Sequence, residues 1–339
     1  MKKFTAFALS SALSFGVMSA EADHFTTHGM NIPDMAEIVN AKANTYLQKA
    51  VNDLNTQGAC NQGVKSEKVL YKELTKYFAN HFKGELVKDM LYTDEVFKVV
   101  TSIQDSIYSE WDMGSGMLLG RRNAGDATLA IYPITRIGDQ NVGIDKFEHM
   151  FGMGQLYFFA HHIDGDSLDN VLRMGVLKEK FLLGGNMMET GVFAYGDLAA
   201  NFNGMRFWNH MLQKRDDVMG KEYNVGPYVS CVDGKWVKNE EHPIDFRNYI
   251  DASYDESINC SRFATKSGFA KFQKALRRLN FISFEDQSAC PLKPEVLEEM
   301  VKKYSVGIEG NKDGKTLASF MINKKGADVT SLVEALKGN

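Results

Sequence analysis

Two short stretches of the 339-residue sequence carry side chains at spacings that suit chemistry. Asp145 and His149 are four residues apart, and Asp197 and Asn201 repeat that spacing. Residues four apart lie on one face of a helix, where a carboxylate and an imidazole can share a proton or a metal ion. Structural roles are the alternatives: Asp145 with Glu148 has the spacing of a capping box, and His149 can be a satisfied core histidine.

Small residues accompany the second pair. Gly196, Ala200 and Gly204 would form a smooth strip along its helix, and Gly152 and Gly154 offer a matching strip on the helix of the first pair. A glycine inside a helix costs about 1 kcal/mol relative to alanine, so its presence predicts the close approach of another backbone. If the two strips face each other, both pairs lie in one buried cluster of acid, imidazole and amide.

Further carboxylates stand where they could join this cluster. Glu189 precedes the second helix, and Glu256 lies in an acidic segment near Cys260; each could also be an ordinary solvent-exposed glutamate. Paired carboxylates can divide the acid and base roles of glycoside hydrolysis. The catalytic residues that we expect are therefore His149, Glu189, Asp197, Asn201 and Glu256.

A divalent metal is the alternative to a cofactor-free site. Asp145, His149 and Asp197, with Asp255 as a further candidate, would offer one imidazole and two or three carboxylates, a set that suits zinc or manganese. Against this, the set holds a single histidine and Asp145 could be occupied as a cap. The sequence contains no dinucleotide fingerprint, Walker loop, H-E-x-x-H pair or G-x-S-x-G elbow, so we expect no other cofactor.

The elements that must position these residues are mainly helical. Apolar side chains recur at helical spacing through the N-terminal part of the chain, which predicts a bundle over residues 31–111, and again in the centre and towards the C-terminus. A hairpin is predicted around Asp233-Gly234. We expect one mainly α domain, 23–339, built around a close-packed helix pair, with one small β-hairpin. The expected helices span 33–54, 66–82, 94–111, 145–162, 167–182, 194–214, 263–279, 294–304 and 330–336, the region 221–339 holding the hairpin and the C-terminal helices.

Residues 112–143 separate the N-terminal bundle from the central helices, 145–214, and contain six glycines. A connection of this length, with one short strand-like run at 128–134, is either disordered or functional. We expect a loop that lines a cleft, with a merely structural excursion as the alternative. Its substrate-binding candidates are Arg121, Tyr132 and Arg136.

Residues 1–22 have the pattern of a secretory signal, because two lysines precede an apolar stretch at 4–17. Small residues at Ala20 and Ala22 predict cleavage before Asp23, with cleavage after Ala20 as the alternative. No later apolar run reaches membrane-spanning length, so we expect no transmembrane segment after cleavage. The predicted location is the periplasm or the exterior of the cell.

Four cysteines remain after the predicted cleavage, and an even number in an exported chain predicts two disulfides. We expect Cys231–Cys260, which would close a local loop, and Cys60–Cys290, which would tie the N-terminal helices to the C-terminal region. The cysteines show no C-x-x-C spacing, which argues against a zinc ribbon or a thioredoxin-type motif.

The order D-K-x-x-H at 145–149, followed by D-x-x-A-N-x-x-G at 197–204, resembles signatures of VanZ-like and YfiM-like bacterial envelope proteins. The resemblance covers residues 145–204. It implies an envelope location and a paired-helix site formed by Asp145, His149, Asp197 and Asn201. It implies no reaction.

The formal net charge of −4 offers no basic surplus for phosphates, so we expect no nucleic-acid partner. Together with the candidate carboxylates, the predicted location favours an exported envelope hydrolase that acts on a cell-wall glycan. The alternative is a noncatalytic periplasmic binding or envelope-assembly protein, in which the polar residues only cap and pin helices.

Overall fold

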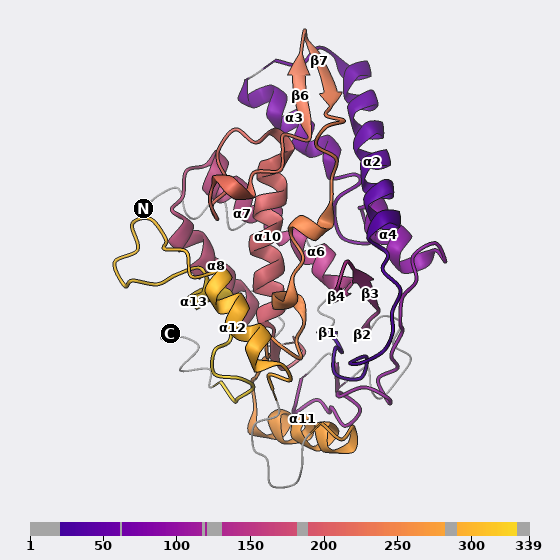
Figure 1. Cartoon of the computed structure of the whole chain (residues 1–339), viewed down its shortest axis with the longest axis vertical. Helices are drawn as coiled ribbons and strands as arrows, with labels where there is room; N and C mark the ends of the chain where they lie inside the picture. The colour runs from indigo at the N-terminus through magenta and orange to yellow at the C-terminus, as the bar shows by residue number, and fades with distance from the viewer. Residues whose placement is uncertain are drawn as a thin grey trace.

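The computed structural model is helix-rich with small two-stranded sheets (Figure 1). Within the described residues no helix combines the length and the apolar character needed to cross a membrane. The largest buried apolar cluster contains side chains from Met35 to Ile322, so the N-terminal and C-terminal helices share a core. The structure describes residues 21–61, 63–116, 119–120, 131–181, 189–281 and 290–330.

Helix α10 (Tyr195–Leu212) occupies the centre of the molecule and packs against α6 (Asp145–Phe151) and α7 (Met153–Phe158) (Figure 1). All its residues from 196 to 211 are buried. The predicted helix pair is confirmed, and glycines permit its close packing: a Cβ on Gly204 would lie 2.1 Å from the Met150 carbonyl oxygen.

The first helix of the pair is interrupted. Gly152 separates α6 from α7, and a π-helical turn, η2 (Phe159–Ile163), follows. Gly154 makes the close approach to α10, because a Cβ there would lie 2.5 Å from the Cα of Gly204. A Cβ on Gly152 would meet only Glu148 of its own helix, so Gly152 is not part of the contact strip.

Three helices form the N-terminal region: α2 (Ala36–Gln57), α3 (Val64–Leu74) and α4 (Glu85–Tyr92). The predicted helix at 94–111 is wrong, because this segment forms turns. Val99 instead makes two backbone hydrogen bonds with Ile134, and Val100 is 70% exposed, which breaks the apolar stripe. The carboxylate of Asp23 accepts the backbone N–H of Ile107 at 2.9 Å and fixes the next turn.

A second hairpin lies where a loop was expected. Strands β3 (Ile134–Ile137) and β4 (Gln140–Gly143) pair antiparallel, and Gly138 makes their turn with φ of +63°. The described part of 112–143 is therefore partly strand, and the expectation of a single hairpin is wrong. Two further pairs of short strands are present. β1 (Glu21–Ala22) runs parallel to β2 (Ile131–Tyr132), and β5 (Val192–Phe193) pairs antiparallel with β8 (Arg262–Phe263).

The predicted hairpin around Asp233-Gly234 is confirmed as β6 (Val229–Val232) and β7 (Lys235–Lys238). Both turn residues have positive φ, +49° and +77°, as a type I′ turn requires. The other predicted helices are present as α8, α11 and α12, but the helix predicted at 66–82 ends as α3 at Leu74, and 331–336 lies outside the described residues. The remaining helical bounds are α8 (Leu168–Phe181), η3 (Lys221–Tyr223), η4 (Phe246–Asn248), η5 (Ala252–Tyr254), α11 (Lys266–Arg278), α12 (Pro294–Lys303) and α13 (Ala318–Met321).

Both disulfides are present, but the predicted connectivity is wrong. The structure joins Cys60 to Cys231 and Cys260 to Cys290, in place of Cys231–Cys260 and Cys60–Cys290. The β6–β7 hairpin reaches back to the end of α2, where the Cys60 N–H donates to the carbonyl of Gly234 at 2.9 Å. This long-range contact brings Cys231 to Cys60. The two disulfides are consistent with an extracellular or periplasmic protein.

Candidate functional site

A buried ammonium group organises one side of the candidate site. The Nζ of Lys146, on α6, donates to Asp145 Oδ2 at 2.8 Å, to Asp197 Oδ1 at 2.6 Å and to Glu256 Oε1 at 2.6 Å. Gly196 leaves room for the side chain of Lys146, since a Cβ on Gly196 would lie 3.2 Å from Lys146 Cε. Burial alone would lower the pKa of Lys146, but the three carboxylates hold it well above its ordinary value. Lys146 is therefore a cation.

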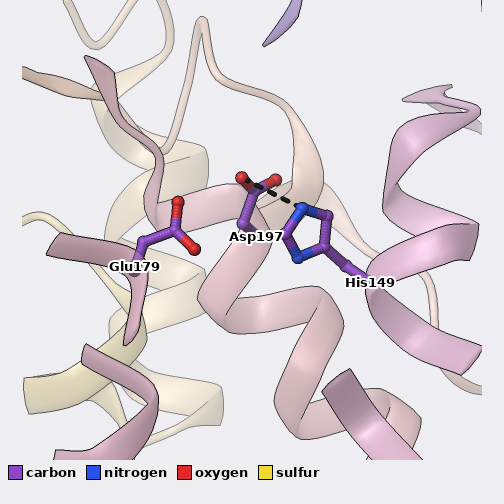
Figure 2. Close-up of side chains that lie close together, drawn as sticks. All are labelled: His149, Glu179 and Asp197. Atoms are coloured by element: carbon purple, nitrogen blue, oxygen red, sulfur yellow. Dashed lines mark ion pairs between the residues drawn. The ribbon is translucent and has the colours of Figure 1, made fainter. Parts of the chain in front are cut away.

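The imidazole of His149 lies one turn further along α6 and meets two side chains of α10. Its Nδ1 is 3.1 Å from Asn201 Oδ1, and its Nε2 is 3.3 Å from Asp197 Oδ2 (Figure 2). Asn201 also hydrogen-bonds the hydroxyl of Tyr157 on α7. The sequence-based expectation that the two four-residue pairs meet in one buried cluster is thus confirmed.

Two glutamates that the sequence analysis missed complete the cluster. Glu179, near the end of α8, hydrogen-bonds Asp197, and its Oε1 has no partner within the described chain. Glu21, on β1, accepts the Thr190 hydroxyl at 2.5 Å, and its other oxygen likewise has no partner there. Burial above all, together with neighbouring carboxylates, raises the pKa of both groups well above the ordinary value.

The cluster has more acidic groups than basic ones. Within the described residues, the basic side chains that pair with its carboxyl groups are Lys146 and His149; the buried His24 acts on Glu256 only electrostatically. No carboxyl group of the cluster is more than 6% exposed. Isolated buried charge is costly, so such a surplus must be matched by protons or by a cation. The five carboxyl groups are those of Glu21, Asp145, Glu179, Asp197 and Glu256.

The carboxyl groups differ in their environment. For Asp197, burial acts to raise the pKa, but His149 and Lys146 outweigh it and leave the pKa below its ordinary value. For Glu256, burial raises the pKa in spite of Lys146. Asp197 lies at the centre of the arrangement, because one of its oxygens faces Lys146 and the other faces His149.

The predicted capping box at Asp145 and Glu148 does not form. The carboxylate of Asp145 makes no capping hydrogen bond and turns to Lys146 instead. Glu148 accepts the backbone N–H of His81 at 2.7 Å, lies 2.6 Å from the His81 Nδ1, and accepts the Tyr132 hydroxyl at 3.2 Å. These contacts tie α6 to the N-terminal region and form a polar group separate from the cluster.

Two of the predicted substrate-binding residues, Tyr132 and Arg136, are not part of the cluster. Tyr132 is 1% exposed and is bound to Glu148, while Arg136 donates to the Gly138 carbonyl at 2.9 Å and closes the β3–β4 turn. Arg121 lies outside the described residues. Two pockets of the described surface, one lined by residues such as Tyr71 and His162 and the other by residues such as Trp236, contain none of the cluster.

Two further candidates have definite positions. Glu189 is half-buried beside Thr190, whose hydroxyl binds Glu21 of the cluster. Asp255 accepts the N–H and the hydroxyl of Ser257 at 2.8 and 2.6 Å, so its carboxylate fixes a local turn. Both residues adjoin the cluster in sequence, since Thr190 binds Glu21 and Glu256 follows Asp255, but neither carboxylate is part of it.

Comparison of the chain with protein-family models, curated proteins and solved structures gives no match. The site must therefore be interpreted from its own chemistry.

Proposed function

We propose that the protein is an exported hydrolase whose catalytic centre is the cluster around His149 and Asp197. The observation that carries the proposal is the ring of His149, which Asn201 and Asp197 hold on its two nitrogen atoms. A base that is oriented by a second and a third polar group is the arrangement that acid–base and nucleophilic catalysis require. The two disulfides support the export part of the proposal.

A cell-wall glycan is the substrate class that we propose. Hydrolysis adds water across the glycosidic bond: an acid gives a proton to the leaving oxygen as the C–O bond breaks, and a base takes a proton from the attacking water. Glu256, held by Lys146, is the carboxyl group that we assign to the acid role, and His149 is the base. Glu189 stays a candidate for the acid role because it adjoins Thr190.

Burial favours a second candidate function. The carboxyl groups of the cluster are at most 6% exposed, so the conformation described here presents none of them openly to a polymer. In a noncatalytic envelope binding or assembly protein, the same residues would join α6, α8 and α10 and fix the core. This function does not require a substrate to reach the buried carboxyl groups.

Release of soluble fragments from purified peptidoglycan distinguishes the two functions. We expect release by the full chain, and a loss of about 100-fold or more in His149→Ala and in Glu256→Gln, because general acid–base groups contribute at least that much. The matched control is Glu148→Gln, a buried carboxylate next to His149 in sequence that lies outside the cluster. Absence of release by folded wild-type protein would reject the hydrolase and leave the noncatalytic function.

A further inference from the structure

We propose that His149, Glu179 and Asp197 bind one divalent metal ion of the zinc or manganese class. The three residues come from α6, α8 and α10, and each offers a ligand atom within 4.8 Å of the others. All three side chains are buried, and Figure 2 shows Glu179 and His149 on either side of Asp197. This inference goes beyond the proposed hydrolysis and is tested separately from it, because a bound ion would occupy a ring nitrogen of His149, the proposed base.

The spacing of two of the ligand atoms already matches a metal site. Zinc binds imidazole nitrogen and carboxylate oxygen at about 2.0–2.2 Å in tetrahedral geometry, which places two such ligand atoms about 3.4 Å apart. The His149 Nε2 and the Asp197 Oδ2 are 3.3 Å apart. An ion could therefore bind both atoms with little movement of either helix.

The hydrogen bonding of His149 also requires a cation or a proton at this point. The Oδ1 of Asn201 is the atom that faces the His149 Nδ1, at 3.1 Å. The proton of a neutral ring then stays on Nδ1, and the lone pair of Nε2 points towards Asp197. Two atoms with lone pairs face each other there, and a metal ion between them satisfies both. A hydrogen bond to the second ring nitrogen is the usual support of a metal-binding histidine.

Glu179 supplies an independent observation. Its side chain is 6% exposed, and its Oε1 has no hydrogen-bond partner within the described residues. A buried polar atom without a partner is rare in native structures and calls for a specific explanation. This carboxyl group faces Asp197 (Figure 2), so a bound ion would satisfy the unpartnered oxygen.

The second group of carboxylates, Asp145, Asp197 and Glu256, also has metal-like spacing, but it already holds a cation. The ammonium group of Lys146 lies 2.6–2.8 Å from one oxygen of each residue. Lys146 therefore replaces a second ion, and we infer one metal per chain. Glu179 takes the place that the sequence analysis gave to Asp145 in the ligand set.

The ligand set has the composition of a functional site. One imidazole and two carboxylates give three protein ligands and leave a coordination position for water, which is the pattern of catalytic rather than structural zinc sites. An ion would also offset part of the carboxylate surplus. Because the ligands must be deprotonated and held by the fold, binding should stabilise the folded chain.

The test uses the full chain, stripped with chelator and titrated with zinc or manganese alone. We expect one equivalent of bound metal by elemental analysis and calorimetry, and a higher melting temperature with metal. Glu179→Gln should weaken binding by about tenfold or more, since it removes a charged ligand. Glu148→Gln is the matched control and should bind like the wild type.

Cobalt(II) provides a second measurement on the wild type if the variants fold poorly, because its visible spectrum changes when nitrogen and oxygen ligands replace water. Binding below one-half equivalent, an unchanged melting temperature or unaltered affinity in folded Glu179→Gln would overturn the inference. Stoichiometric metal without peptidoglycan release would uphold the metal site and count against the hydrolase. Peptidoglycan release by a protein that binds no metal would overturn the metal site and uphold the hydrolase.

Discussion

The two halves of α10 carry buried polar groups of opposite character. In the second half, Arg206 donates from Nε to both oxygens of Asp217 at 3.0 and 2.8 Å, and His210 lies 3.1 Å from the same carboxylate. The other ring nitrogen of His210 is 2.7 Å from the Tyr249 hydroxyl, which lies 2.5 Å from that of Tyr228. This balanced network pairs one guanidinium with one carboxylate.

The first half of the helix, with Asp197 and Asn201, belongs to the cluster with a surplus of carboxyl groups and with unpartnered oxygens. Both halves are equally buried and lie on one helix. Burial is therefore the same in the two networks, and charge balance is the property that differs. A network that only holds a fold is expected to neutralise its own charges, which is why we propose the site in the first half of the helix.

The largest expected effect concerns the balanced network. Asp217→Ala would leave Arg206 buried without its counter-ion, and breaking one partner of a buried pair costs about 3–5 kcal/mol. Urea unfolding near neutral pH measures this loss. The exposed neighbour Asp216 is the matched control, and Asp216→Ala should change stability by less than about 0.5 kcal/mol. If Asp217→Ala and Asp216→Ala lowered the free energy of unfolding equally, the comparison between the two halves of α10 would lose its basis.

The contact between the helices should be almost as sensitive. Gly204→Ala would place a Cβ 2.1 Å from the Met150 carbonyl oxygen, so the backbones must separate. Overpacking of this kind costs about 3 kcal/mol, and it should also weaken any metal binding by displacing α6 from α10. Gly268→Ala, in α11, is the control, because its nearest contacts are at 3.3 Å or more. If Gly204→Ala changed neither stability nor metal binding, the close approach of the two helices would not position the site.

A third prediction concerns pH. Burial lowers the pKa of His162 to about 3, so the folded state keeps this ring neutral while the unfolded chain protonates near its ordinary value. The unfolded state then binds more protons below pH 6.5, and stability falls as the pH drops. This contribution amounts to about 2 kcal/mol between pH 7.5 and pH 5. The charged and titratable groups around the ring are His161, His210, Arg215 and Asp217.

Urea unfolding at the two pH values measures this slope. His162→Leu should reduce it by the stated amount, whereas His161→Leu, at the less buried neighbouring position, should largely retain it. An unchanged slope in His162→Leu would assign the pH dependence to other groups, such as His210 of the balanced network, whose pKa burial also lowers.

The smallest effect is expected in the acidic cluster. Glu179→Gln, measured in the presence of chelator, should change stability by less than about 1 kcal/mol, because burial already favours the uncharged form of this carboxyl group, which the amide resembles. The amide also keeps a donor for Asp197. Thermal unfolding of Glu179→Gln and Asp217→Ala under the same conditions compares the two losses of stability directly. A loss similar to that of Asp217→Ala would mean that the cluster is as balanced as the other network.

The part of the site that local spacing controls was predictable from sequence. Four-residue spacing placed His149 and Asn201 correctly, and helix glycines such as Gly204 indicated which faces meet. The three buried ionisable groups that the sequence analysis missed, Lys146, Glu179 and Glu21, have no local signal. Lys146 and Glu179 carry side chains that are usually solvated, and Glu179 stands between two lysines, as on an exposed face.

Glu21 was hidden by its assignment to the predicted signal. Cleavage before Asp23 would remove it together with β1, whereas cleavage after Ala20, the alternative, would keep it. The strands were missed for a related reason: β3 and β4 lie in a glycine-rich segment whose pairing depends on partners such as Val99. Such contacts are nonlocal, and hydrophobic periodicity does not report them.

The disulfide pairing has a consequence for how the chain matures. The bonds join the first cysteine to the second, Cys60 to Cys231, and the third to the fourth, Cys260 to Cys290. A polypeptide that enters an oxidising compartment with its N-terminus first exposes its cysteines in this order. In an exported chain, oxidation in the order of appearance would yield these bonds directly, without thiol–disulfide exchange to correct them.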